Sequence, residues 1–151
     1  MVVDVGCGTG CALRHAAPRV SDGTLIGVDP VPRMIEIARE RTAAHPHGAR
    51  IEFRVGPAEA LPVEDGLADV LLAFDSIDHW QDRGRGLAEL RRVLKPRGQL
   101  VLVKDGSVPG GAEARRGLVD ELSSAGFELL REEQLQEGEV TCTMWVCAPI
   151  G

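Results

Sequence analysis

The sequence predicts an α/β fold, in which helices cover both faces of an open and mostly parallel sheet. Short apolar segments alternate along the chain with segments of helical periodicity, which is typical of βαβ units. Three glycines at alternate positions, Gly6, Gly8 and Gly10, separate the first apolar segment from the first helical one. The last two apolar segments, 127–130 and 140–147, are expected to pair as antiparallel neighbours. The predicted sheet is therefore doubly wound and mostly parallel, with seven strands and an antiparallel strand near the C-terminus.

Strands are expected where β-branched and other apolar residues cluster or alternate with polar ones. Residues 70–74 are apolar throughout, which is typical of a strand that is buried on both faces. The expected strands are residues 2–5, 25–28, 51–55, 70–74, 99–103, 127–130 and 140–147.

Four helices are expected between these strands, and prolines and glycines mark their ends. Pro30 and Pro32 open the second helix, and residues 45–48 end it. Residues 95–98 are expected to stop the third helix, and residues 106–111 form a linker. The other helices are expected at residues 11 to about 18, 87–94 and about 112–124. The apolar face of the second helix is expected to comprise Met34, Ile35, Ile37 and Ala38.

The composition fits one domain, residues 1–151, which is large enough for a hydrophobic core. The net charge of −6 and the pI near 5.2 argue against nucleic-acid binding, which needs a basic face. No apolar run approaches the roughly 18 residues of a membrane span, and no signal peptide is recognised. The four cysteines fit neither a disulfide framework nor a metal site, and His45 and His47 lack a third ligand. We therefore expect a cytoplasmic protein with reduced thiols and without a membrane segment, a nucleic-acid partner or a metal.

The glycine turn is the most informative motif, because a strand, a glycine turn and a helix N-terminus together form a nucleotide-binding corner. The spacing is G-x-G-x-G, and Cys11 occupies the position where a dinucleotide fingerprint has its third glycine. Asp4, two residues before Gly6, would repel a pyrophosphate but suits a ligand with positive charge. S-adenosylmethionine carries an ammonium, a sulfonium and no phosphate. The alternative is an ordinary strand, turn and helix in which the glycines are incidental.

The segment 2–10 closely resembles the first motif of class I S-adenosylmethionine-dependent methyltransferases. The resemblance covers essentially the whole chain, including the structural segment 87–98, and implies a Rossmann-like fold. It also implies that Asp4, Gly6, Gly8 and Gly10 belong to the cofactor site.

Asp29 and Pro30 match the second position of this family pattern. Asp29 ends the second expected strand, 19 residues after Gly10, where an acid is placed to accept hydrogen bonds from both ribose hydroxyls. The resemblance places Pro30 along the adenine face. The alternative role for Asp29 is a helix N-cap.

Residues 55–62 resemble the third motif of the family, in which the backbone N–H of the residue at Ala58 meets the adenine ring. Pro57 stands where the family commonly has an Asp that binds the adenine amino group. Proline offers neither an acceptor side chain nor an N–H, so Glu59 or a water would have to replace that contact. The alternative is that Ala58 is an ordinary loop residue.

Residues 75–82 correspond to the substrate-facing loop of the family. The resemblance implies that the backbone carbonyl of Phe74 receives the ammonium of the cofactor. His79 is either a general base or a residue that caps or orients the loop. Asp75 and Asp78 either contact the substrate or are solvated loop carboxylates.

The sequence thus predicts an S-adenosylmethionine-dependent methyltransferase that methylates a small molecule by in-line displacement. The family normally has helices before the first strand, whereas this chain starts at that strand. Either the start is truncated, or a second copy in a homodimer or a partner chain covers the site, or the site stays open. The alternative function is a non-catalytic cofactor-binding module or a partner subunit. A nicotinamide dehydrogenase is disfavoured by Cys11 and Asp4.

Overall fold

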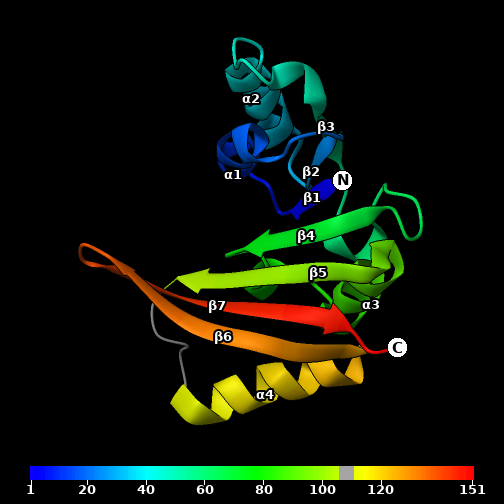
Figure 1. Ribbon diagram of the computed structural model, residues 1–151, viewed down its shortest axis with the longest axis vertical. Coiled ribbons are helices and arrows are strands. Elements are labelled where there is room, and N and C mark those ends of the chain that lie inside the picture. The colour runs from blue at the N-terminus through cyan, green and yellow to red at the C-terminus, as the bar shows by residue number, and fades with distance from the viewer. Residues whose placement is uncertain (106–110) are drawn as a thin grey trace.

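The computed structural model describes residues 1–105 and 111–151, which form a seven-stranded sheet in the order β3-β2-β1-β4-β5-β7-β6 (Figure 1). The first five strands are parallel to one another. Strand β7 runs antiparallel to both of its neighbours, β5 and β6. The strands are β1 (Val2–Val5), β2 (Leu25–Asp29), β3 (Ile51–Val55), β4 (Ala68–Phe74), β5 (Leu94–Asp105), β6 (Phe127–Glu137) and β7 (Val140–Pro149). The predicted fold class is therefore confirmed.

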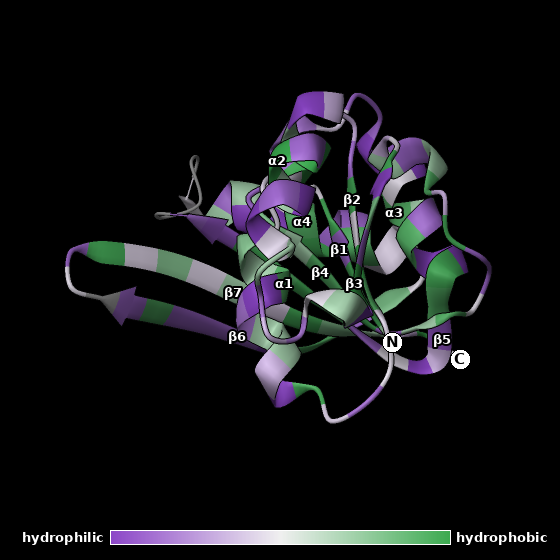
Figure 2. Cartoon of the chain, turned by 90° about the horizontal axis from the view of Figure 1, so that it is seen from above, coloured by the Kyte–Doolittle hydropathy of each residue, from purple (hydrophilic) through white to green (hydrophobic). Residues whose placement is uncertain are grey.

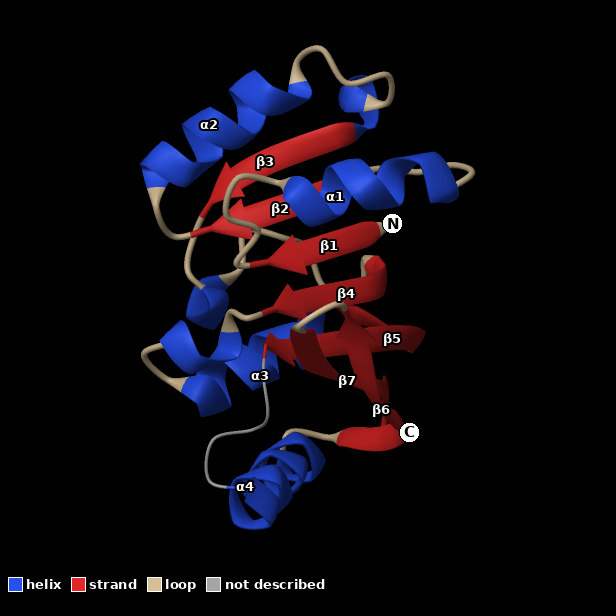
Figure 3. Ribbon diagram, turned by 90° about the vertical axis from the view of Figure 1, so that its left-hand side faces the viewer, coloured by secondary structure: helices blue, strands red, loops and turns tan. Residues whose placement is uncertain are grey.

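Helices pack on both faces of the sheet (Figure 3). Helices α1 (Cys11–Ala16) and α2 (Pro32–Thr42) cover one face of β1, β2 and β3, whereas α3 (Arg83–Val93) and α4 (Gly111–Ser124) pack on the other face. Within residues 1–105 and 111–151, no helix is both long and apolar enough to cross a bilayer. Four short 3-10 helices join these elements: η1 (Ala17–Arg19), η2 (Gly48–Arg50), η3 (Ala58–Ala60) and η4 (Ile77–His79).

The central strands are buried on both faces, and their alternate residues enter two separate hydrophobic clusters. In β1, Val3 and Val5 join the cluster beneath α3 and α4, whereas Val2 joins the cluster beneath α1 and α2. Figure 2 shows the hydrophobic residues concentrated on the strands inside the molecule and the hydrophilic ones on the outer parts of the helices. Burying one such aliphatic side chain contributes about 1.5–3 kcal/mol to the stability of the fold.

The chain reverses its direction of winding at β1. It proceeds from β1 outward to β2 and β3, and then crosses back so that β4 lies on the other side of β1. The carboxyl ends of β1 and β4 therefore flank a switch point, where open α/β sheets bind their ligands.

Helix α3 ends at Val93, next to the residues expected to stop it, but β5 starts at Leu94 and not at the expected residue 99. The pairing with β4 shifts between Ala68–Leu94 and Val70–Gln99. Pro96 lies in this irregular stretch, where the absence of its N–H does not interrupt a regular ladder. The strand thus continues through a segment that its composition marks as a stop.

Among the other described elements, β6 and α3 extend furthest beyond their expected bounds. Strand β6 extends to Glu137 because it is the edge strand, so its polar residues beyond Leu130 can face solvent while the backbone pairs with β7. Helix α3 begins at Arg83 because the Asp82 side chain accepts a hydrogen bond from Arg85 N at 2.9 Å and caps the helix. Of the expected linker 106–111, residues 106–110 lie outside the described residues.

The packing of β2 against α1 makes a prediction about Gly27. An added Cβ at this buried position would lie 2.8 Å from Cys7 Sγ, 2.8 Å from Phe53 Cδ1 and 3.0 Å from Leu13 Cδ1. We expect Gly27→Ala to lower the free energy of unfolding, measured in urea, by about 1–3 kcal/mol through overpacking. Gly117→Ala in α4 is the matched control, because its Cβ would meet nothing within 4 Å. It is expected to raise the same free energy by about 0.5–1 kcal/mol. A Gly27 variant as stable as the wild type would contradict this packing.

Candidate cofactor-binding site

A cavity of about 840 Å³ lies at the carboxyl ends of β1, β2 and β4, where the switch in strand order predicts a ligand site. This volume is in the range of small-molecule and cofactor sites. Seven of the predicted site residues line it: Gly6, Gly8, Asp29, Pro30, Ala58, Asp75 and His79. Four others, Asp4, Gly10, Phe74 and Asp78, are not part of the lining.

The glycine turn brings backbone to the cavity in a conformation that other residues rarely adopt. Gly6 and Gly8 have φ angles of 78° and 52°. A Cβ on Gly6 would collide with Ser76 Cβ in the loop after β4, whereas a Cβ on Gly8 would meet nothing within 4 Å. Gly6 therefore allows the β4 loop to approach β1, and the open space beside Gly8 is available to a ligand.

Two arginines hold the turn through Thr9. Arg14 Nη1 of α1 donates to the Thr9 carbonyl at 2.7 Å, and Arg41 Nη1 of α2 donates to Thr9 Oγ1 at 3.3 Å. Helix α1 thus holds the backbone of the turn and α2 holds the Thr9 side chain, which preorganises the turn for binding.

Asp29 connects the turn to the end of β2. Its Oδ2 accepts a hydrogen bond from Gly8 N and its Oδ1 accepts one from Val31 N, both at 2.9 Å. The N-cap residue of α2 is Val31, and no side chain caps that helix, so Asp29 is not its N-cap. Each carboxylate oxygen has a second lone pair, and the buried Asp29 side chain borders the cavity. The side chain can therefore accept further hydrogen bonds from a ligand.

Asp4 is 2% exposed beneath the turn, and its Oδ1 has no hydrogen-bond partner among the described residues. Burial and, secondarily, the nearby charge of Asp29 raise the pKa of Asp4 to about 7. Two acids thus lie close together in the protein interior. In the described part of the chain, neither carboxylate is ion-paired with a Lys or Arg. Such a site favours a ligand that brings positive charge and disfavours a phosphate.

The helix η3 forms another wall of the cavity, and Ala58 is buried in it. Glu59 Oε1 accepts a hydrogen bond from Asp82 N at 3.0 Å. Partial burial opposes ionisation of Glu59, but the N–H groups of Asp82, Glu59 and Gln81 outweigh it and lower its pKa below the ordinary value. One oxygen of Glu59 is therefore already engaged by the protein.

The loop after β4 separates its two predicted acids. Asp75, which has a φ of 51°, lines the cavity, and its Oδ1 accepts a hydrogen bond from Asp105 N. Asp78 instead forms ion pairs with Arg83 at 3.0 Å and with Lys104 at 2.7 Å. His79 is exposed and lines the cavity, and the described residues offer its ring no hydrogen bond. The geometry therefore places His79 and Asp75 where a ligand could touch them and directs Asp78 to a structural ion pair.

Several lining residues are not predicted from the sequence. Val31 and Met34 are 47% and 39% exposed and give the cavity an apolar side. Met34 is expected on the buried face of α2, but the buried residues of that helix are Ile35, Ala38 and Thr42. Met34 directly precedes Ile35, the first buried residue of α2, and an apolar residue at such a position could have identified Met34 as a lining residue. The lining also includes Gly56, Pro57, Glu59 and Ala60 of the expected third motif and Ser76, Trp80, Gln81 and Asp82 of the expected substrate-facing loop, whereas Arg85 lies outside both.

A second hollow of about 600 Å³ lies between α2 and the edge strand β3. It contains none of the predicted site residues. Arg39 Nη2 donates to the Phe53 carbonyl there at 2.8 Å, which covers part of the strand edge. Gly6, Gly8 and Asp29 thus border the larger cavity, and Asp4 is buried beneath the turn.

The burial of Asp4 predicts a pH dependence of stability. Its pKa is raised in the folded state, so folding binds a proton there between about pH 4 and pH 7. The contribution of Asp4 to the free energy of unfolding should therefore fall by up to about 1.4 kcal/mol per pH unit as the pH rises through this window. Urea unfolding at pH 5 and pH 7.5 should show this loss in the wild type but not in Asp4→Asn. Asp120→Asn, at an exposed position on α4, should follow the wild type, and an equal pH response in all three proteins would refute the prediction.

Comparison with known proteins identifies the family of this chain. A family model described as a methyltransferase domain matches residues 3–102. The ubiquinone/menaquinone biosynthesis C-methyltransferase UbiE of Geotalea uraniireducens is 36% identical over 104 residues, which are 68% of this chain and 44% of that protein. The chain thus spans less than half the length of this curated relative.

Solved structures share the fold over nearly all of the chain. A SAM dependent methyltransferase from Aquifex aeolicus has a TM-score of 0.80 at 20% identity, covering 97% of this chain and 81% of that one. A structure described as the complex between the Haloferax volcanii Trm112 methyltransferase activator and the putative methyltransferase has a TM-score of 0.85 at 19% identity, covering 99% of this chain and 82% of that one. The resemblance seen in the sequence is confirmed, and this chain belongs to the methyltransferase-domain family.

Proposed function

We propose that this chain binds S-adenosylmethionine in the cavity at the glycine turn and transfers its methyl group to a small molecule. The observation that carries the proposal is the pair of buried acids at the turn. Asp4 and Asp29 lie together without a Lys or Arg partner in the described residues, and Asp4 Oδ1 has no hydrogen-bond partner there. An ammonium and a sulfonium would compensate this charge, whereas a dinucleotide pyrophosphate would add to it.

The lining residues supply the other contacts that the cofactor needs. The free lone pairs of Asp29 would accept hydrogen bonds from the two ribose hydroxyls. Pro30 and Met34 would pack against one side of the adenine, and Ala58 would lie on the other side. The open position at Gly8 would let the ligand approach the backbone. The carbonyl of Phe74, at the end of β4, remains the proposed partner of the ammonium.

Bound S-adenosylmethionine would supply an electrophilic methyl group, so the bond from sulfur to methyl breaks as the bond from methyl to acceptor forms. The cavity would hold the acceptor in line with that bond, which is the main contribution in such a displacement. A proton lost by the acceptor would pass to water or to His79, which lines the same cavity. Asp75 is placed to orient the acceptor.

A small-molecule acceptor is supported by the shape and charge of the site. The cavity of about 840 Å³ is in the range of small-molecule sites, and the net charge of −6 disfavours a nucleic-acid acceptor. The curated relative UbiE is named as a methyltransferase of ubiquinone and menaquinone biosynthesis, which supports the same class of acceptor. All four cysteines are free, which is consistent with a reducing compartment such as the cytoplasm.

The alternative of a non-catalytic cofactor-binding module rests on the length of the match. The match covers 44% of UbiE, so more than half of that methyltransferase has no counterpart in the match. A second copy or a partner chain covering the cavity remains part of the proposal. The Haloferax volcanii neighbour was solved in complex with an activator protein. Light scattering with and without cofactor tests whether this chain associates with itself.

The role of Asp29 gives a direct test of cofactor binding. We expect calorimetry to detect binding of S-adenosylhomocysteine and none of NAD. Asp29→Ala should weaken binding by roughly 1.5–3 kcal/mol, about 10- to 150-fold, because hydrogen bonds to a charged group are lost. Asp22→Ala, at an exposed position after η1, is the control and should bind as the wild type does. Unchanged affinity in Asp29→Ala, together with reduced stability, would show that Asp29 only anchors Gly8 and Val31.

Turnover separates the enzyme from the binding module. A screen of quinol, phenol, amine and thiol acceptors should produce S-adenosylhomocysteine with at least one of them. The product should depend on acceptor concentration and form more slowly in Asp29→Ala when the cofactor is below saturation. Tight cofactor binding without turnover on any acceptor would favour the module.

A further inference from the structure

We infer that Arg92 and Glu89 of α3 are positioning residues for the cavity wall at η3, although neither side chain lines the cavity. They act through residues 61–66, which follow η3 directly. The inference rests on the proposed function, because the wall that they hold is the one proposed to contact adenine.

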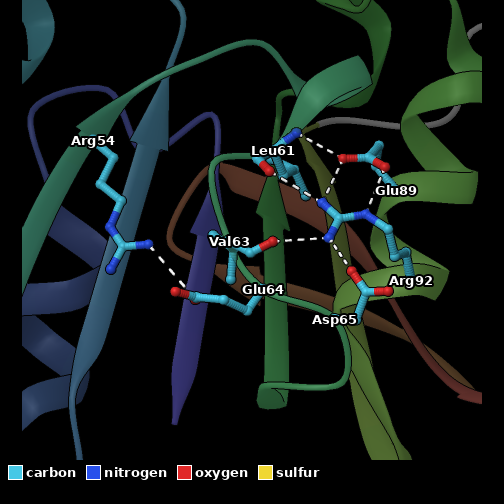
Figure 4. A network of polar contacts seen from close by, with 7 residues as sticks. All are labelled: Arg54, Leu61, Val63, Glu64, Asp65, Glu89 and Arg92. Carbon is cyan, nitrogen blue, oxygen red and sulfur yellow. Dashed lines mark hydrogen bonds and ion pairs between the residues drawn. The ribbon is translucent and has the colours of Figure 1, made fainter.

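Arg92 uses all five of its N–H donors. Two of them form a bidentate pair with Glu89, from Nε to Oε1 and from Nη2 to Oε2, each at 2.7 Å. The other three donate to the carbonyl of Leu61 at 3.0 Å, the carbonyl of Val63 at 2.9 Å and Asp65 Oδ1 at 2.6 Å (Figure 4). A lysine has three donors on one nitrogen and cannot reproduce this planar set.

Glu89 completes the clamp from the same helix. Its Oε2 accepts the Leu61 N–H at 2.8 Å, so Leu61 is held at both its N–H and its carbonyl. Hydrogen bonding to Glu89 and Asp65 raises the pKa of Arg92, and hydrogen bonding to Arg92 lowers that of Glu89. Their side chains are 30% and 20% exposed, so water competes less with this pair than with a surface ion pair.

The clamp holds a segment that has little regular backbone pairing of its own. Residues 61–67 lie between η3 and β4, and their polar backbone groups need partners from elsewhere. The Arg92 carbonyl accepts the Gly66 N–H at 2.9 Å, and Arg54 of β3 donates to the Pro62 carbonyl at 2.7 Å from the other side. Arg54 also forms an ion pair with Glu64 at 4.0 Å, so the segment is held from both α3 and β3 (Figure 4).

Both ends of η3 are therefore tied to other parts of the site. On its far side, Gly56 N donates to the Asp29 carbonyl at 3.1 Å, and Glu59 accepts from Asp82 N at the start of α3. At the C-terminal end of η3, Leu61 is held by Arg92 and Glu89. The position of Ala58 relative to Asp29 thus depends on the clamp, and so does the fit of a base whose ribose is held by Asp29.

The test compares ligands that differ only in the base, because the Ala58 N–H expected to meet the adenine ring would face a ring nitrogen that accepts a hydrogen bond in adenine but carries a hydrogen in hypoxanthine. S-adenosylhomocysteine and S-inosylhomocysteine are titrated by calorimetry into wild type, Arg92→Ala, Arg92→Lys, Glu89→Gln and the control Arg91→Ala. Arg91 is the next residue on α3, and its Nη2 contacts the Ile150 carbonyl at 3.2 Å, away from η3. Urea unfolding of each variant identifies the folded ones, and Arg92→Lys and Glu89→Gln are the mildest changes.

We expect Arg92→Ala and Arg92→Lys to bind S-adenosylhomocysteine about 10-fold more weakly and to lose most of the preference for adenine, while Arg91→Ala keeps both. Equal losses for the two ligands, or wild-type affinities in folded Arg92 and Glu89 variants, would overturn the inference. A wild type that binds the two ligands equally would overturn it as well. Wild-type protein that binds neither ligand would refute the proposed function itself.

Discussion

The hydrogen bond from Gly8 N to Asp29 Oδ2 joins the two strand ends on which the rest of the site depends. The glycine turn can adopt its positive φ angles because it consists of glycines at alternate positions, and the carboxylate of Asp29 then holds it against the end of β2. Arg14 and Arg41 reach the same turn from the covering helices. The order of the strands, the glycine turn and Asp29 thus together define the cavity at the switch point.

Burial of acids is the second constraint, and it explains why the site suits one kind of ligand. A protein interior tolerates an ionised carboxylate poorly unless it is paired. Asp4 is unpaired in the described residues and keeps a proton more readily than an exposed acid does. The buried, unpaired Asp4 beside Asp29 therefore destabilises the free protein, and a cationic ligand would relieve this destabilisation on binding.

Local sequence patterns predicted the fold and placed the glycine turn and Asp29 beside each other at the cavity. The glycine turn, Asp29 and the seven strands follow from residue types that are adjacent in the sequence, so their expected positions were close to the observed ones. Features that depend on distant partners were not predictable in the same way. Asp78 pairs with Lys104, which lies on β5, and the role of Arg92 depends on a loop 27 or more residues earlier in the chain. Met34 was misplaced because the apolar stripe of a helix does not show by itself where a cavity begins.

The central claim is that Asp4 and Asp29 form a site for a cationic ligand, and proton exchange on binding tests it most directly. Calorimetry of S-adenosylmethionine binding at pH 7, in buffers of different ionisation enthalpy, counts the protons released. With a pKa of about 7, Asp4 is about half protonated in the free protein, and a nearby cation would drive that proton off. The account predicts that the wild type releases up to about half a proton more than Asp4→Asn. Equal proton release by the two proteins, with binding intact in both, would contradict it.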